Sequence, residues 1–390
     1  MISESRLNEL QQPLLEVFNN IENDLLTNIA KRLEFDLDID ENSVTAWQTE
    51  KLSQLGALNQ ENVRTIARKA NRIDSEIETA IRKIGFESVN DDEKIYEAAI
   101  KQGLLNKIDT TVRQSSAIQN IIQIAIAQAK DKANLTNTTA LENTNQEFLN
   151  IVNQTFLEVS TGTRDYKSSI RSAIKRLADK GITGQTYDTN RGILRYPIDS
   201  AIRREVLTTT LQSAGQMQLA RLQEYDLNLV EVTSHVGSRP DHAAWQGKIY
   251  AVNGTQGRFR NLADVTGYGE VTGLQGANCR HQFFPYIEGI SKKRFEPIPL
   301  RQSNKVYKES QMQRYLERQV RKEKRRLIML DEIGDREGFV AGSVKLKQKE
   351  LNLRNFKKKT GRTQQNRVEV VGFNRSISQK AVQANKKAVK

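Results

Sequence analysis

The 390-residue chain contains 60 Lys and Arg residues against 47 Asp and Glu, a formal net charge of +13, and only 37% of its residues are hydrophobic and 6% aromatic. This composition argues against one large apolar core, although the length is sufficient for two or three domains. The first residues, MISESRLNEL, are polar, and no apolar run approaches the ~18 residues that span a bilayer. We therefore expect neither a secretory signal nor a membrane partner. The single cysteine excludes an intrachain disulfide and suits a reducing compartment.

Helical periodicity dominates the first 225 residues. Pro13 fits an early position of a helix, because its missing N–H group costs nothing there. Asp109 is a candidate N-cap for a long second helix. The Asn- and Thr-rich stretch 134–145 predicts a break in that helix, because these side chains compete for backbone hydrogen bonds.

The clearest helix in the sequence covers residues 168–182. Ser168 or Ser169 can cap its start, and Gly181 can adopt the left-handed conformation that often ends a helix. A further helix is expected from about residue 198 to residue 224. Together these segments predict a mainly α fold for the N-terminal part of the chain.

The pattern changes to short strands after Asp226. Alternating apolar residues over 227–236 predict one strand, and 248–252 and 281–287 are candidates for two more. Pro285 favours an edge position, because proline cannot donate to a neighbouring strand. Six glycines between residues 253 and 278 indicate loops rather than helices there.

Positive charge is concentrated near the C-terminus. Residues 301–390 hold 25 basic and 9 acidic residues, a net charge of +16, whereas residues 1–300 carry −3. Two basic helices separated by a break at 332–338 are expected, followed by an arm from Gly361. Such asymmetry indicates non-specific binding to double-stranded DNA, and a solvated lysine-rich helical face is the alternative. The candidate DNA-binding residues are Arg321, Lys322, Lys324, Arg325, Arg326, Lys357, Lys358 and Lys359.

The predicted fold class is therefore mainly α, with three regions along the chain. Residues 1–160 form a long helical body, residues 161–300 a small α+β domain, and residues 301–390 a basic helical tail and arm. All three histidines and the only cysteine fall in the middle region, between His235 and His281. Any specific chemistry is expected there.

Four side chains of that window, His235, His242, Cys279 and His281, are the donor types that zinc prefers. The Cys-x-His spacing is tighter than that of usual paired zinc ligands, so we expect no cofactor, with zinc as the alternative. A buried, hydrogen-bonded knot that stabilises the α+β domain is the favoured interpretation, and Trp245 is expected to anchor it to the core. The predicted knot comprises His235, Arg239, Asp241, His242, Trp245, Gln246, Gly247, Asn278, Cys279, Arg280 and His281.

Catalysis is the competing hypothesis for the same window. Cys279 with a histidine and Asp241 has the residue types of a thiol hydrolase. His242 with Asp241, Asp264 or Glu270 has those of a metal-dependent hydrolase, a nuclease for example, which the basic tail would deliver to nucleic acid. The sequence contains no HExxH, GxSxG or P-loop motif, and no helix-turn-helix or zinc finger. We therefore assign no catalytic residue and expect no enzymatic activity.

Two segments of the window, SHVGSRPDHAAWQGKIY (234–250) and GANCRHQFFPYIEGIS (276–291), resemble the phage minor capsid protein 2 family. This family is similar to the wider Mu F-like head morphogenesis group of tailed phages. The resemblance extends to IKRLADKGIT (174–183), MQRYLERQVRKEKR (312–325) and LRNFKKKTGRTQQNRVEV (353–370), and covers roughly residues 160–370. The related Mu F-like pattern usually ends in Cys-Arg-Cys, whereas His281 occupies the last place here.

The resemblance implies a structural virion component present in few copies, inside the capsid at the portal vertex. It implies a role in head morphogenesis, with the portal and the major capsid or scaffolding proteins as partners, and a location in the host cytoplasm during assembly. No enzymatic activity is implied. The basic tail would then lie near packaged DNA.

Overall fold

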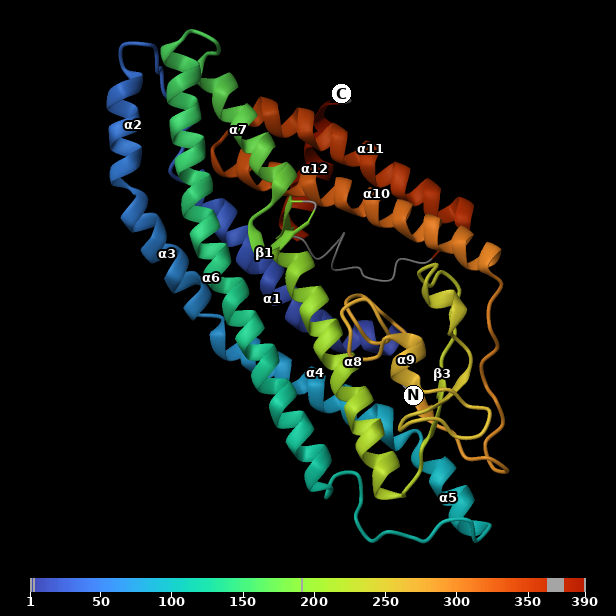
Figure 1. Cartoon of the computed structure of the whole chain (residues 1–390). Coiled ribbons are helices and arrows are strands. Elements are labelled where there is room, and N and C mark those ends of the chain that lie inside the picture. Colours follow the sequence, from blue (N-terminus) through green and yellow to red (C-terminus); the bar gives the residue numbers. More distant parts are fainter. Residues whose placement is uncertain (1, 3, 191, 363–374, 389–390) are drawn as a thin grey trace. The chain divides into compact units, whose positions relative to one another are not determined.

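The computed structural model describes residues 2, 4–190, 192–362 and 375–388 (Figure 1). It is mainly helical with two small antiparallel sheets, which confirms the predicted fold class. The helices are α1 (Glu4–Ala30), α2 (Val44–Ser53), α3 (Leu55–Ala67), α4 (Ala70–Asn90), α5 (Glu93–Lys101), α6 (Ser116–Ser160), α7 (Tyr166–Lys180), α8 (Ile198–Glu224), α9 (Leu262–Thr266), α10 (Leu300–Glu332), α11 (Arg336–Thr360) and α12 (Arg375–Ala388). Within the described ranges, no helix is both long enough and apolar enough to cross a bilayer.

The chain forms two compact units, each assembled from segments that are distant in sequence. The first comprises Met1–Pro13, Asp74–Lys132 and Arg203–Met312, and the second Leu14–Ile73, Ala133–Ile202 and Gln313–Lys390. Each unit takes residues from all three regions proposed from the sequence. The histidine and cysteine window belongs entirely to the first unit, and most of the basic tail to the second.

Two predictions about the early helices were wrong. Pro13 lies inside α1, which already begins at Glu4, so it does not mark a helix start. The long helix α6 begins at Ser116 rather than near Asp109, because the hydroxyl of Ser115 accepts a hydrogen bond from the N–H of Ile118 at 3.2 Å.

The break predicted at residues 134–145 is absent, and α6 continues without interruption to Ser160. Thr136 and Thr144 are fully buried in this stretch. The hydroxyl of Thr144 donates to the carbonyl of Ala140 at 2.6 Å, within the helix itself. The Thr144 hydroxyl is therefore satisfied by the helix itself, and the burial of both side chains overrides their low helix propensity.

The next two helices were predicted well. α7 runs from Tyr166 to Lys180 and ends at Gly181, whose φ is +73°. Its cap is Asp165, which accepts from the N–H of Ser168, so the prediction of a serine cap was wrong. α8 covers Ile198–Glu224, as expected. Between these helices lies an antiparallel hairpin of β1 (Thr183–Thr189) and β2 (Gly192–Pro197), which was not predicted.

The predicted strand region is a three-stranded antiparallel sheet in the first unit. Its strands are β3 (Leu229–Val232), β4 (Ile249–Ala251) and β5 (Phe283–Pro285), in the order β4-β3-β5. All three predicted strands are therefore present, and Pro285 lies on an edge strand as expected. The segment 253–278 is not purely loop, because it contains the short helix α9, which is capped by Asn261.

The basic helices α10 and α11 are separated at Ile333–Asp335, as predicted. Asp335 caps α11 by accepting from the N–H of Gly338 at 2.9 Å. The arm predicted from Gly361 was wrong for residues 375–388, which form α12, and residues 363–374 lie outside the described residues.

A buried ion network fixes the middle of α10 within the second unit. Arg325 Nη2 lies 3.0 Å from Glu22 Oε2 and 3.5 Å from Asp199 Oδ1, and Arg321 Nε lies 3.1 Å from Asp199 Oδ2. The other oxygen of Glu22 accepts from the N–H of Ile182 at 3.0 Å. Because Glu22, Arg321 and Arg325 are buried and the Asp199 side chain is only 10% exposed, each charge depends on its partners for the solvation that it has lost.

We predict that Arg325→Ala lowers the free energy of unfolding by about 3–5 kcal/mol, because it leaves the carboxylate of Glu22 buried without its partner. Chemical denaturation of the full chain measures this. The control is Lys167→Ala, since Lys167 pairs with Asp36 at 3.5 Å and both side chains are exposed. That change should cost less than about 1 kcal/mol. Equal effects of the two substitutions would contradict the prediction.

Candidate functional site

The motif residues gather at one end of the strands of the β4-β3-β5 sheet, where β3 ends and where β4 and β5 begin. β3 ends just before His235, η1 (His242–Ala244) immediately precedes β4, and Cys279 and His281 immediately precede β5. Both neighbours run antiparallel to β3, with Glu231 paired to Ile249 and Val232 to Phe283. The end of β3 therefore lies beside the starts of β4 and β5, which brings three distant parts of the window together.

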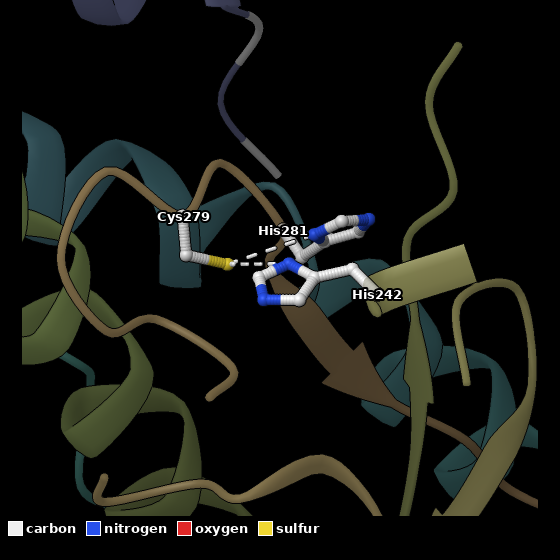
Figure 2. Close-up of side chains that lie close together, drawn as sticks. All are labelled: His242, Cys279 and His281. Atoms are coloured by element: carbon white, nitrogen blue, oxygen red, sulfur yellow. Dashed lines mark hydrogen bonds between the residues drawn. The ribbon is translucent and has the colours of Figure 1, made fainter. Parts of the chain in front are cut away.

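Three of the four proposed ligands, His242, Cys279 and His281, meet in the interior. Figure 2 shows the Cys279 sulfur facing one nitrogen of each imidazole ring. Cys279 Sγ lies 3.6 Å from His281 Nδ1 and 3.9 Å from His242 Nδ1. All three residues are at most 3% exposed. The fourth candidate, His235, is half-buried and packs against the ring of His281, with 4.3 Å between the ring centroids.

The hydrogen bonds of Gln246 determine the tautomer of His281. Gln246 Oε1 accepts from the backbone N–H of His235 at 3.1 Å, so this atom must be the amide oxygen. It lies 3.1 Å from His281 Nε2, which must therefore carry a proton and donate. Burial lowers the pKa of His281 well below its ordinary value, and neighbouring positive charge lowers it further. The ring is therefore neutral, and its Nδ1 presents a lone pair to the Cys279 sulfur.

His242, the other histidine in contact with the sulfur, has two alternative hydrogen-bond arrangements. Its Nε2 lies 3.0 Å from the carbonyl oxygen of Thr272, which needs a donor, and 2.8 Å from Arg239 Nη2, which needs an acceptor. Arg239 Nη2 also donates directly to the Thr272 carbonyl at 2.9 Å. Burial lowers the pKa of His242, so this ring too is neutral, with its proton on Nε2 or on Nδ1.

Cys279 is a protonated thiol in these surroundings. Burial raises the pKa of its thiol above the ordinary value. Its S–H can donate to His281 Nδ1, while His242 Nδ1–H can donate to the sulfur. A continuous chain of hydrogen bonds then runs from the Arg239 guanidinium through the two imidazoles and the thiol to Gln246. Such a thiol is the opposite of an activated nucleophile, which requires a lowered pKa and access to solvent.

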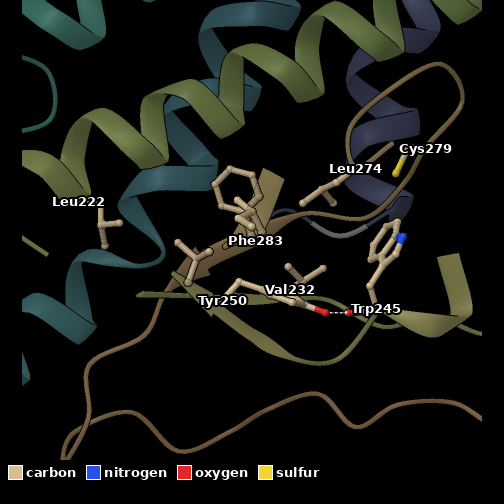
Figure 3. Packing of buried hydrophobic residues seen from close by; sticks show 9 residues of the cluster. Leu222, Val232, Trp245, Tyr250, Leu274, Cys279 and Phe283 are labelled. Atoms are coloured by element: carbon tan, nitrogen blue, oxygen red, sulfur yellow. Dashed lines mark hydrogen bonds between the residues drawn. The ribbon is translucent and has the colours of Figure 1, made fainter. Parts of the chain in front are cut away.

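Trp245 connects this cluster to the core of the first unit (Figure 3). It is 6% exposed, and its ring lies 4.5 Å from that of His242 and 4.7 Å from that of His281, measured between centroids. The hydroxyl of Tyr250 donates to the Trp245 carbonyl at 2.9 Å. The surrounding apolar cluster consists of Leu222, Val230, Val232, Trp245, Tyr250, Leu262, Leu274, Cys279 and Phe283.

Two glycines allow the backbone to close around the site. Gly247 has φ +67°, and a Cβ there would lie 2.7 Å from the carbonyl carbon of Glu296. At Gly273 a Cβ would lie 1.9 Å from the backbone oxygen of Gly267. Only glycine fits these two close backbone contacts, the second of which lies within the loop that carries Thr272.

The remaining predicted knot residues lie at its periphery. Asp241 is exposed, with Oδ2 4.0 Å from His242 Nε2, and Arg280 is half-buried. Asn278 is exposed and adopts φ +60°. Asp264 and Glu270, the proposed partners of a metal-dependent hydrolase, do not join the cluster of donor atoms found among the described residues.

Three contributors to the site were not predicted from the sequence. The backbone oxygen of Thr272 and the hydroxyl of Tyr250 carry no motif signal, because their roles depend on the tertiary fold. Ser238 forms a buried hydroxyl pair with Ser303 at 2.9 Å, a contact between residues 65 positions apart. None of these partners has a spacing that the sequence alone would single out.

The predicted DNA-binding residues divide into two groups. Arg321, Lys324 and Arg325 are buried, and their ion pairs include those to Asp199, Glu350 and Glu22, so the prediction that they contact DNA needs correction. Burial lowers the pKa of Lys324, as expected for a cation removed from water. Lys322, Arg326 and Lys357 are half-buried, whereas Lys358 and Lys359 are exposed at the end of α11.

We predict that Trp245→Ala lowers the free energy of unfolding by about 3–5 kcal/mol, because the substitution leaves a cavity beneath the histidine cluster. Urea denaturation followed by circular dichroism measures the loss. Val271→Ala in the same unit is the control, since Val271 is 75% exposed and its truncation should change stability by less than about 0.5 kcal/mol. A loss below about 1 kcal/mol for Trp245→Ala would contradict the structural role.

Comparison with known proteins identifies the chain's relatives. The model of the family described as phage minor capsid protein 2 matches residues 2–358. A structural protein of Lactococcus phage LL-H is 28% identical over 323 residues, which cover 80% of this chain and 84% of that protein. A structural protein of Lactococcus phage mv4 is 41% identical over 69 residues, which cover 18% of this chain and 56% of that protein. No solved structure matches the chain.

The family match extends beyond the histidine and cysteine motifs. It covers nearly all of both compact units, including the N-terminal helices, where the sequence motifs gave no resemblance. This agreement confirms the family inferred from the motif segments. The chain therefore belongs to the phage minor capsid protein 2 family, and its role in the phage is a structural one.

Proposed function

We propose that the protein is a minor component of the phage head, present in few copies inside the capsid at the portal vertex, where it acts in head assembly. The observation that carries this proposal is the family match over residues 2–358. The structure of the motif region supports a non-enzymatic role, because Cys279 is a buried thiol and both neighbouring histidines are neutral and hydrogen-bonded. In this proposal the motif region holds the fold together rather than acting on a substrate.

We further propose that the exposed side of α11 contacts packaged DNA. Lys347, Arg354 and Lys358 are exposed and lie seven and four residues apart, which places them along one side of the helix. Lys345 and Lys359 are also exposed, at other positions around the helix. Phe339, Leu346 and Leu353 bury a neighbouring side of α11, about 100° around the helix axis from the strip, while the strip itself is exposed. A row of this kind can neutralise successive phosphates without reading sequence.

The head location predicts a specific distribution of the protein in phage particles. Purified heads should contain this chain in far fewer copies than the major capsid protein, and cross-linking should join it to the portal protein. Quantitative mass spectrometry of heads, with and without cross-linker, measures both. Copy numbers equal to those of the major capsid protein, or cross-links to tail proteins alone, would contradict the proposal.

The DNA contact predicts that the combined variant Lys347→Glu, Arg354→Glu and Lys358→Glu binds duplex DNA more weakly and with less dependence on salt. The slope of log affinity against log salt should fall by about 2.7, since each lost phosphate contact removes about 0.9. Fluorescence anisotropy at several salt concentrations measures the slope.

A charge-matched variant separates this local effect from that of net charge. Lys101→Glu, Lys107→Glu and Lys292→Glu change the net charge by the same amount at exposed positions of the first unit. This control should retain most of the salt dependence. If both triple variants lose affinity equally, DNA is bound through overall charge and the assignment to α11 is wrong.

A further inference from the structure

We propose that His242, Cys279 and His281 form a binding site for one zinc ion, coordinated by the sulfur of Cys279 and the Nδ1 atoms of the two histidines (Figure 2). The proposal is independent of the role in the head, because it rests on the donor atoms alone. Among the described residues, these are the His, Cys, Asp and Glu side chains that form such a cluster, and their donor atoms all lie within 4.8 Å of one another.

The spacing of the donor atoms suits a tetrahedral zinc ion. Zinc bonds sulfur at about 2.3 Å and imidazole nitrogen at about 2.0–2.1 Å, which separates the two donors by about 3.5 Å at a tetrahedral angle. The distances from Cys279 Sγ to the two Nδ1 atoms are 3.6 and 3.9 Å. The two sulfur–nitrogen distances therefore exceed this value by at most a few tenths of an ångström, and rotation of the side chains would bring all three donor atoms, which lie within 4.8 Å of one another, around the ion.

Both histidines are oriented by acceptors on their outer nitrogens. His281 Nε2–H donates to Gln246 Oε1 at 3.1 Å, and His242 Nε2 can donate to the carbonyl of Thr272 at 3.0 Å. In protein zinc sites the outer nitrogen of a ligating histidine usually donates to a carbonyl, a carboxylate or water, which fixes the tautomer and aims the other nitrogen at the metal. This arrangement was not detectable from the Cys-x-His spacing.

Zinc binding exchanges one proton for the metal. The thiol of Cys279 loses its proton to solvent and binds as thiolate, while both imidazoles bind through neutral lone pairs. The lowered pKa values of both histidines support this state, because neither ring must first be deprotonated near neutral pH. His242 then holds its proton on Nε2, so Arg239 keeps its bond to the Thr272 carbonyl and gives up its contact with the ring.

Three protein ligands leave the fourth position of the ion to a water molecule. His235 packs on the outer side of His281 but does not belong to the donor cluster. It is therefore a matched control, since it is the same residue type, in the same window and in contact with a proposed ligand.

The test begins with the full chain, expressed and purified without chelator and kept reduced. Elemental analysis should find about one zinc ion per chain, as expected for a single site. Dialysis against a chelator followed by cobalt(II) alone should then give a thiolate-to-cobalt charge-transfer band and the intense visible bands of tetrahedral cobalt. These bands report the sulfur ligand directly and require no activity assay.

Variants connect the signal to the assigned residues. Cys279→Ser should abolish the charge-transfer band, and His281→Gln should lower zinc affinity at least tenfold. Gln246→Met keeps all three ligands but removes the acceptor for His281 Nε2–H, and should weaken zinc binding on the order of 10–100-fold. His235→Ala should retain both zinc and the cobalt spectrum. Circular dichroism establishes that each variant is folded, and the cobalt titration of the unmodified chain remains decisive if a variant fails to fold.

Two results would overturn the proposal. One is the lack of both zinc and a thiolate-cobalt band in the folded, reduced full chain. The other is a band that survives Cys279→Ser or disappears with His235→Ala, which would place the metal elsewhere. Neither result bears on the location of the protein in the head, which is tested separately by the composition and cross-links of purified heads.

Discussion

The antiparallel pairing of β3 with both β4 and β5 is the constraint on which the motif region depends. Because both neighbours run opposite to β3, the chain leaves β3 at the same edge where it enters β4 and β5. His242 and Cys279 are 37 residues apart, yet this topology places them in contact. Parallel pairing of either neighbour would have put its motif residues at the opposite end of a short strand. The sheet is small, but it determines which side chains meet.

Polar satisfaction then makes the arrangement specific. An apolar core tolerates several side-chain arrangements. A buried amide or imidazole, in contrast, destabilises the folded state unless its hydrogen-bond partners are present. The oxygen of Gln246 illustrates this, because it serves both the His235 N–H and His281 Nε2, whereas the nitrogen of the same amide has no partner among the described residues. That single acceptor sets the amide orientation, the tautomer of His281 and the direction of the lone pair that faces Cys279. The rare residues of the window are thus joined by mutual hydrogen bonding as well as by proximity.

Local patterns in the sequence predicted the strands, the helix over 198–224 and the break between the two basic helices. These local patterns gave a wrong prediction where contacts in the folded protein override the conformational preference of a segment. The Thr-rich stretch 134–145 continues as helix because Thr144 bonds back to Ala140 inside a packed interface. The sequence marked His242, Cys279 and His281 as candidates for one site but could not predict that they meet. Their contact depends on the order and direction of the strands, which the spacing of the motifs does not encode. Thr272 contributes through its backbone oxygen, which leaves no trace in residue type.

The basic tail shows why net charge overstates the number of basic side chains that are available to bind a polyanion. Residues 301–390 carry a net charge of +16, yet Arg321 and Arg325 neutralise carboxylates from segments far away in sequence. Arg325 and Glu22 are 303 residues apart, so no local pattern could separate such a pair from a solvated cation. Charge held in buried pairs stabilises the fold and cannot also neutralise phosphate. Affinity for a polyanion must therefore come from the basic residues left on the surface, and in α11 three of these, Lys347, Arg354 and Lys358, share one exposed side of the helix.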